Sequence, residues 1–232
     1  MLGSLFGLSG GHAHDHVSRL LPILKKALAR LGVLPENTVT DVEQIKQLID
    51  KYGKVIIDAT ECRCARPSNS EQQEAYYSGK KKQHTVKSLL ISDINKYIVF
   101  ISLVVPGSQH DYALMKKLFD PSKPWFENVE TYLDLGFLGA SKEYAGKGII
   151  KLPHKRPRKS KNTPHPALTD RQKKENKQHA ALRIAVEHAI GGMKHFHCLA
   201  YKIRNHLDNL INYFFQVCAG LHNLNLLSQS MT

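Results

Sequence analysis

The stretch 55–67 reads VIIDATECRCARP, and it decides the fold class. It opens with an apolar run rich in β-branched residues, which is typical of a buried strand, and the run stops at the carboxylate of Asp58. A carboxylate in such a place is costly to bury unless it is paired or ligates a cation. The stretch therefore predicts a strand that ends at a candidate functional acid.

Four further stretches have the character of strands, because they are short, rich in β-branched or aromatic residues and bounded by turn residues. They are HTVKSLLISD (84–93), YIVFISLVVPG (97–107), VETYLDLGF (129–137) and GIIKLPHK (148–155). The first three strands of the chain follow one another closely, which predicts an antiparallel meander. A helical stretch at 110–120 and the segment 141–147 separate the later strands. The order predicts an α/β fold in which helices pack against a sheet.

Helical patterns occupy both ends of the chain. Apolar residues recur at helical spacing over 12–32, where Pro22 interrupts the pattern, and a Gly-Gly turn with a short apolar piece precedes it. This order fits part of a helix-turn-helix over 1–35, or an ordinary helical hairpin. The segment 36–53 resembles a linker with one short helix. Two apolar-faced helices, 174–196 and 209–227, close the chain and suit the cover of a sheet face.

Charge indicates the kind of partner. The 232 residues include 33 Lys and Arg against 20 Asp and Glu, a formal net charge of +13 and a pI near 9.6. A field of this sign attracts polyanions, so nucleic acid is the expected partner. A membrane is not expected, because the longest apolar stretch, 97–105, is about half of what a spanning helix needs. The start lacks the features of a signal peptide, and the four cysteines predict reduced thiols in a cytosol.

Much of the positive charge lies in the segment 151–177, which contains ten Lys or Arg against two acids. Four prolines at 153, 157, 164 and 166 predict an open loop. Such a segment can be an arm that follows DNA phosphates, or a solvated, flexible linker.

Three acids lie where carboxylates are costly to bury. Asp58 ends the first strand, Asp134 ends the apolar run of the fourth, and Glu187 lies among apolar residues of a late helix. If the first and fourth strands are neighbours, the two aspartates converge, and Glu187 can approach from the helix packed across them. Hard oxygen ligands of this kind suit Mg²⁺ or Mn²⁺, and two such ions about 4 Å apart support in-line phosphoryl transfer. A capping or salt-bridged carboxylate is the alternative for each acid taken alone.

Several motifs together resemble one family. They are DATE followed by RP, YYSGKKKQHTVK (76–87), PGSQHDYALM (106–115), YLDLGFLG (132–139) and RIAVEHAIGGMKHF (183–196). In order and spacing they resemble DDE-superfamily transposases of the bacterial insertion-sequence family five type, which are related to the Harbinger nucleases. The resemblance covers about 54–200, with a weaker match at 1–35.

The resemblance implies an RNase H-like catalytic core over 54–232: a five-stranded mixed sheet flanked by helices, with a basic insertion at 151–177. It also implies a short, truncated N-terminal helical region. Asp58, Asp134 and Glu187 would bind two divalent ions, Mg²⁺ or Mn²⁺. Water would attack the phosphodiester at an element end, and the released 3′-hydroxyl would attack target DNA.

Arg183, Glu187 and Lys194 form R-x3-E-x6-K, which resembles the end of a Y-x2-R-x3-E-x6-K motif in related transposases. The resemblance implies that Arg183 and Lys194 hold DNA phosphates, whereas Ala180 replaces the motif's Tyr. Further candidates for contact with the DNA backbone are Lys80, Lys81, Lys82, Lys87, Lys155, Arg156, Arg158 and Lys159.

Other residues offer alternative roles. Asp111 follows a Pro-Gly turn and begins a helix, which favours a structural role at the helix start. Glu61, three residues after Asp58, is expected to point away from that acid or to pair with a basic neighbour such as Arg66. The stretch GHAHDH (11–16) could bind a metal, although it is one residue shorter than the motif H-x-H-x-D-H. A zinc site from cysteines 62, 64 and 198 with histidines 195 and 197 is a further alternative, but its spacing matches no common zinc finger.

Three functions remain open at this point. The first is a transposase that acts as a homo-oligomer on inverted-repeat element ends and on target DNA, in the cytoplasm at the nucleoid. Because the match begins within the expected helix-turn-helix, the second is a non-catalytic DNA binder or repressor of transposition. The third is a domesticated nuclease without strand transfer.

Overall fold

A computed structural model describes residues 2–144, 148–159, 167–204 and 208–230. Its elements, in chain order, are α1 (Leu2–Leu5), α2 (Gly10–Arg30), α3 (Val42–Ile49), η1 (Asp50–Tyr52), β1 (Lys54–Arg63), α4 (Ser70–Tyr76), β2 (Tyr77–Ser78), β3 (Gln83–Asp93), β4 (Ile98–Ile101), β5 (Val105–Pro106), α5 (Asp111–Leu118), β6 (Phe126–Tyr132), η2 (Leu135–Phe137), α6 (Ala140–Glu143), β7 (Gly148–Lys151), α7 (Asp170–Lys194), α8 (His197–Ala200) and α9 (Asp208–Ser230).

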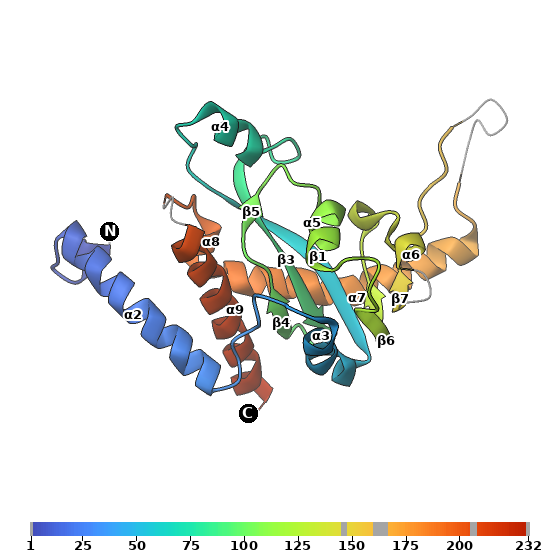
Figure 1. Cartoon of the computed structure of the whole chain (residues 1–232), viewed down its shortest axis with the longest axis horizontal. Coiled ribbons are helices and arrows are strands. Elements are labelled where there is room, and N and C mark those ends of the chain that lie inside the picture. Colours follow the sequence, from blue (N-terminus) through green and yellow to red (C-terminus); the bar gives the residue numbers. More distant parts are fainter. Residues whose placement is uncertain (1, 145–147, 160–166, 205–207, 231–232) are drawn as a thin grey trace.

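A mixed sheet forms the centre of the molecule (Figure 1). Its strand order is β2-β3-β1-β6-β7, and both β4 and β5 pair with β3. The pairs β1–β3 and β3–β4 are antiparallel, which confirms the predicted meander, whereas β6 is parallel to both β1 and β7. The predicted third strand is divided into β4 and β5. The mixed sheet with flanking helices confirms the α/β class and is consistent with an RNase H-like core.

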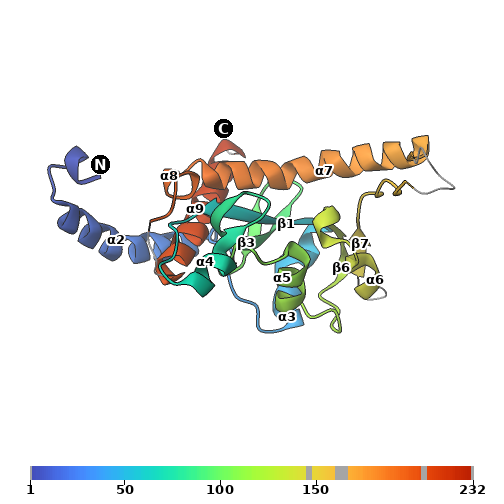
Figure 2. The same cartoon turned by 90° about the horizontal axis from the view of Figure 1, so that it is seen from above.

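Helices cover both faces of the sheet, and each face has its own apolar core. One core joins α3 and α5 to the sheet through residues such as Ile49, Met115 and Phe126. The other joins α7, α8 and α9 to the opposite face through residues such as Val186 and Phe215. Figure 2 shows α7 along one side of the sheet, with α3 and α5 on the other. The helix that carries Glu187 therefore crosses the strand that carries Asp58, as the apolar patterns predict.

The segment 36–53 differs from the expected linker. It contains the predicted short helix, α3, but Ile45 and Ile49 of that helix are completely buried against the sheet. Two fully buried isoleucines tie a short helix firmly to its neighbours, since each contributes about 2 kcal/mol of apolar burial. The segment is therefore packed as part of the α/β domain.

The basic segment 151–177 is only partly a loop. Helix α7 begins at Asp170, four residues before the predicted start at 174, because Thr169 and Gln172 form a reciprocal capping box. The basic residues of 170–177 therefore lie on a helix, while those of 152–159 lie outside helices and strands. The remainder of the predicted loop, 160–166, lies outside the described residues.

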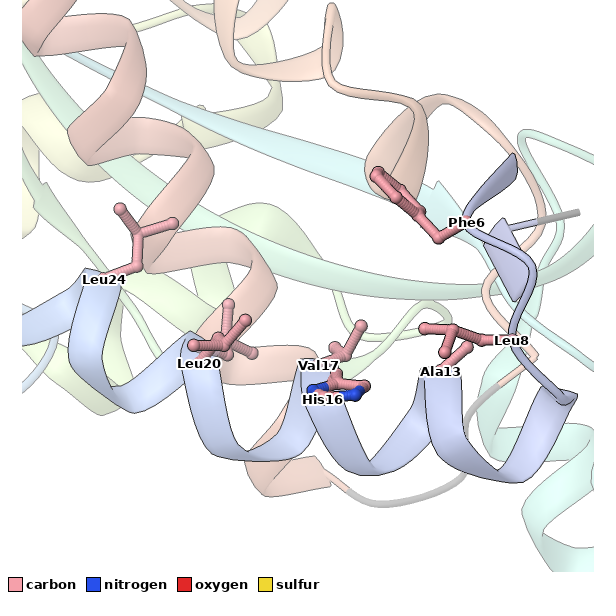
Figure 3. A pocket seen from close by; sticks show the side chains of 8 residues that line it. Phe6, Leu8, Ala13, His16, Val17, Leu20 and Leu24 are labelled. Carbon is pink, nitrogen blue, oxygen red and sulfur yellow. The ribbon is translucent and has the colours of Figure 1, made fainter. Parts of the chain in front are cut away.

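The N-terminal helices lie beside the domain. Helix α2 continues through Pro22, and its C-terminal part packs on α9 through Leu28 and Val217. Its N-terminal half lies away from the sheet in both views (Figures 1 and 2). There, α2 and the loop before it line an apolar groove of about 450 Å³ that includes Phe6, Leu20 and Leu24 (Figure 3). Among the described helices, none has the length and apolarity to span a membrane.

Candidate active site

Strand pairing explains why the two aspartates are neighbours. In the parallel pair of β1 and β6, Ile56 lies beside Tyr132, and each aspartate follows its strand partner by two residues. Because side chains alternate along a strand, a step of two residues returns both to the same face of the sheet. Asp58 and Asp134 therefore lie on the same face of adjacent strands, as predicted. The expectation that the first strand ends at Asp58 is wrong, because β1 continues to Arg63, whereas Asp134 does follow the end of β6.

Asp58 is largely buried, since its side chain is 16% exposed. Its Oδ1 accepts the Ala59 N–H at 2.8 Å, and its Oδ2 accepts from Arg183 Nη2 at 3.0 Å. Burial raises the pKa of the Asp58 carboxyl above its usual value, and the negative charge of Asp134 adds to this rise. The guanidinium of Arg183 and the Ala59 N–H act in the opposite direction. A second cation at this place would therefore favour the ionised form of Asp58.

Asp134 caps a tight turn. Its Oδ1 accepts the Gly136 N–H at 2.7 Å at the start of η2. A Cβ on residue 136 would lie 2.8 Å from Asp134 Oδ1 and 3.3 Å from Asp111 Oδ2, so glycine keeps this space open. The same distances reveal that Asp111, from the start of α5, reaches the turn that holds Asp134. Asp111 is the first residue of α5, as predicted, but it does not cap the helix, because His110 is the N-cap and no side chain caps α5. Its carboxylate pairs with Lys87 and lies near Asp134 instead.

Glu187 approaches from α7 but is separated from the aspartates by Arg183. The Arg183 Nη2 atom lies 3.0 Å from Asp58 and 4.0 Å from Glu187, one helical turn further along α7. The Glu187 side chain is 58% exposed, whereas that of Arg183 is 18% exposed. Within the described residues, no group of three His, Cys, Asp or Glu side chains is arranged to hold a metal ion. The structure thus brings Asp58 and Asp134 together and leaves Glu187 at the outer side of Arg183.

Most of the residues predicted to contact DNA lie on the surface, and a few do not follow this rule. On the surface lie 80–82, in the turn between β2 and β3, and the four basic residues of 155–159, after β7. Lys194 is nearer the acids, where its Nζ donates to the Glu61 carbonyl oxygen at 2.7 Å.

Lys87 is not on the surface. Its side chain is only 6% exposed, and its Nζ pairs with Glu61 and Asp111. This corrects the expectation that Lys87 contacts DNA, since a duplex cannot reach a buried ammonium. Glu61 thus has a basic partner, as expected, but that partner is Lys87; Arg66 donates to Gln73 instead.

Sequence reasoning did not predict this buried group of charges. Glu61 and Lys87 are cross-strand partners on β1 and β3, so only the register of the strands could have revealed the pair. Asp111 joins them from α5. The alternative zinc site is not formed in the described part of the chain; there Cys198 Sγ lies 3.3 Å from Cys218 Sγ instead.

A cleft of about 880 Å³ adjoins the acids between β6, β7 and the N-terminal half of α7. Its lining includes Lys54, Lys151, Asn176 and His179. His179 precedes Arg183 by one helical turn, and its Nε2 donates to the Lys151 carbonyl oxygen at 3.2 Å. Burial lowers the pKa of His179, so a neutral imidazole is favoured there. The lining of the cleft also includes Tyr132 and Leu182, which lie close in sequence to Asp134 and Arg183, and does not include those two residues.

Comparison with known proteins shows the family of the chain. The family described as DDE superfamily endonuclease matches residues 57–223. The probable transposase for insertion sequence element IS702 from Microchaete diplosiphon is 28% identical over 184 residues, which are 79% of this chain and 61% of that relative. The chain therefore spans less than two thirds of the length of this relative. No solved structure matches the chain.

Proposed function

Since the chain belongs to the DDE superfamily endonucleases, we propose that it cleaves DNA at the ends of an insertion sequence and joins the released 3′-ends to target DNA. The observation that carries the proposal is the parallel pairing of β1 with β6, which supports a shared site for Asp58 and Asp134. The likeness to an insertion-sequence transposase supports the choice of DNA ends as substrate.

Asp58, Asp134 and Glu187 would hold the divalent ions, Mg²⁺ or Mn²⁺. The donor set supports this assignment, because carboxylate oxygens are the ligands that these hard cations prefer. The raised pKa of the buried Asp58 supports it as well, since a cation would relieve both the burial and the repulsion from Asp134. Bound ions of this kind supply positive charge that stabilises an in-line phosphoryl transfer. Glu187 would complete the set by turning past Arg183 toward the aspartates.

The basic residues around the acids would bind and orient the DNA. The Arg183 side chain is 18% exposed, and a guanidinium has five N–H donors, so it can donate to a phosphate oxygen as well as to Asp58. The cleft between β6, β7 and α7 contains Lys54 and Lys151, but also Glu130 and Glu175, so Arg183 and the exposed lysines and arginines would supply the main attraction for DNA. Charge-assisted bonds of this kind position the backbone and carry no sequence information by themselves.

The surface lysines and arginines would extend this contact on both sides. The turn 80–82 lies at the β2 edge of the sheet and the segment 155–159 follows β7 at the other edge, with β1 and β6 between them. A duplex laid over the acids would therefore meet positive charge at both ends. Six or more such contacts make binding strongly dependent on salt.

The N-terminal region and the assembly are parts of the same proposal. Helices α1 and α2, joined by a short turn, would form part of a helix-turn-helix over 1–35 that reads DNA. A homo-oligomer would hold two inverted-repeat ends together. Because it would cleave and join chromosomal DNA, the protein would act at the nucleoid in the cytoplasm.

A second candidate function is non-catalytic DNA binding, as in a repressor of transposition. The observation that favours it is Glu187, whose side chain is 58% exposed and forms no metal-binding group with the two aspartates in the described residues. A third candidate is a nuclease that cleaves DNA without strand transfer, because the same acids would serve cleavage and strand transfer.

The test is cleavage of DNA cloned from both flanks of the gene, in Mg²⁺ or Mn²⁺, by the wild type, Asp134→Asn and Glu187→Gln. We expect new 3′-hydroxyl ends from the wild type, and at least a hundredfold less product from either variant, because each removes a charge that the transition state needs. Glu127→Gln is the matched control, since Glu127 lies at the opposite end of β6 and pairs only with Lys46 among the described ion pairs.

Binding without any cleavage by the wild type would support the repressor. Cleavage without joining to a target would support the nuclease. Cleavage that survives both substitutions would exclude the three-acid site.

A further inference from the structure

Lys87 is the most unusual charged residue outside the proposed ligands. It lies on β3 directly opposite Glu61 of β1, and its side chain is 6% exposed. Lysine is almost never buried to this degree unless it is paired, because the transfer of an ammonium out of water is costly. Its contacts must therefore account for its burial.

The Lys87 ammonium joins three segments of the chain. Its Nζ lies 2.7 Å from Asp111 Oδ1 and 3.4 Å from Glu61 Oε1, and it donates to the Gln109 carbonyl oxygen. The second Glu61 oxygen accepts from Thr85 Oγ1 at 3.0 Å. Strands β1 and β3 and the start of α5 thus share one buried cation.

One end of this group lies beside a proposed metal ligand. Asp111 Oδ2 and Asp134 Oδ1 lie 3.3 Å and 2.8 Å from the same point, the place where a Cβ on Gly136 would be. Glu61 follows Asp58 by three residues on β1, so its side chain lies on the opposite face of the sheet from that of Asp58. A shift of Lys87 would therefore reach Asp134 through Asp111.

We propose that Lys87 is a positioning residue: its buried ammonium, fixed between Glu61 and Asp111, holds Asp111 in place and, through it, sets the position of Asp134 relative to Asp58. The inference rests on the proposed function, in which these two aspartates bind divalent ions. Lys87 also neutralises two carboxylates that lie close to the site. Groups that orient metal ligands in this way typically change metal affinity 10–100-fold when they are removed.

The test compares Mn²⁺ affinity between the wild type and the double variant Lys87→Met/Asp111→Asn, by electron paramagnetic resonance of the free ion. The double variant removes one positive and one negative charge, so the net charge near the site stays the same. We expect its dissociation constant for Mn²⁺ to rise 10–100-fold. Lys46→Met/Glu127→Gln is the matched control, because it removes a 2.7 Å ion pair that lies on the surface.

Thermal unfolding separates positioning from stability. A purely structural role would lower the melting temperature and leave the Mn²⁺ affinity of the folded protein unchanged, which would overturn the inference. If the double variant does not fold, Asp111→Glu replaces it, since it keeps the charge and moves the carboxylate by one methylene; unchanged affinity there would overturn the inference too. A wild type that does not bind Mn²⁺ would instead refute the proposed metal site, whatever Lys87 does.

Discussion

At the scale of single residues, the pair of Asp58 and Arg183 controls the charge of the site. Asp58 is largely buried, and Arg183 supplies a nearby positive charge at 3.0 Å. The Arg183 guanidinium also lies within 4.0 Å of Glu187, so it occupies the space through which Glu187 would approach Asp58. A divalent cation and this guanidinium would therefore compete for the same carboxylate oxygen.

Arg183→Gln tests this competition. We expect the free energy of unfolding in EDTA to fall by about 2 kcal/mol, because a largely buried carboxylate loses its charged partner. Saturating Mn²⁺ should raise the melting temperature more in the variant than in the wild type, since the competing cation is absent. Calorimetry with and without Mn²⁺ measures both effects.

Arg171→Gln is the control, because Arg171 pairs with Glu175 at 2.8 Å on an exposed part of the same helix. A surface pair of this kind contributes about 0.5 kcal/mol at most. Equal effects of Mn²⁺ in the wild type and in Arg183→Gln would show that Arg183 and the metal do not share Asp58.

At the scale of elements, the position of α7 decides where Arg183 and Glu187 lie. The helix packs on β1 through residues such as Val186 and on α9 near its C-terminal end. There Gly192 of α7 meets the ring of His222 of α9, whose Nε2 donates to the Lys96 carbonyl oxygen at 3.0 Å. The close approach of the two helices requires a residue without a side chain at 192.

Gly192→Ala and Gly191→Ala should therefore have opposite effects. A Cβ at 192 would lie 2.2 Å from His222 Nδ1, whereas a Cβ at 191 would meet nothing within 4 Å. We expect Gly192→Ala to lower the free energy of unfolding by about 1 to 3 kcal/mol through overpacking. Gly191→Ala should raise it by about 0.5 kcal/mol, because alanine is the better helix former. Urea unfolding measures both, and equal stability of the two variants would contradict the close packing of α7 on α9.

At the scale of the whole molecule, the net charge of +13 is organised around the sheet. The acids lie at the central strands β1 and β6, and exposed basic segments lie toward both edges, at 80–82 and 155–159. An anionic duplex is attracted to the periphery, and its scissile phosphate can then reach the acids. The N-terminal half of α2, with its apolar groove, lies apart from the sheet that carries these acids and basic segments (Figure 1).

Replacing Lys80, Lys81 and Lys82 by Gln tests the placement of DNA. We expect weaker binding of a labelled duplex and a reduction of about one per lysine in the slope of log K against log salt. Lys51, Lys117 and Lys123, replaced together by Gln, provide the control with the same change of charge, because they are exposed on or near η1 and α5. Fluorescence anisotropy over a salt series measures both, and equal slopes for the two triple variants would remove the turn 80–82 from the DNA surface.

Much of this arrangement could be predicted from the sequence. Apolar periodicity and turn residues located the meander, the later strands and the two closing helices, because these patterns reflect local backbone preference and the side that faces the core. The ends of two apolar runs identified Asp58 and Asp134, and the motifs around them identified the family before any comparison. The start of α7 was misplaced, because the capping box at Thr169 was not recognised.

The tertiary structure alone decided which charges meet. Arg183 and Asp58, which pair, are 125 residues apart in the sequence. Lysine is usually an exposed residue, yet Lys87 is buried because it pairs with Glu61 and Asp111. The segment 36–53, which has the sequence of a linker, is likewise part of the domain, because its residues Ile45 and Ile49 are buried against the sheet. Local sequence determines the tendency of a segment to form a helix or a strand. The cost of burying a charge depends on groups brought close from distant segments, and only the folded chain establishes which groups those are.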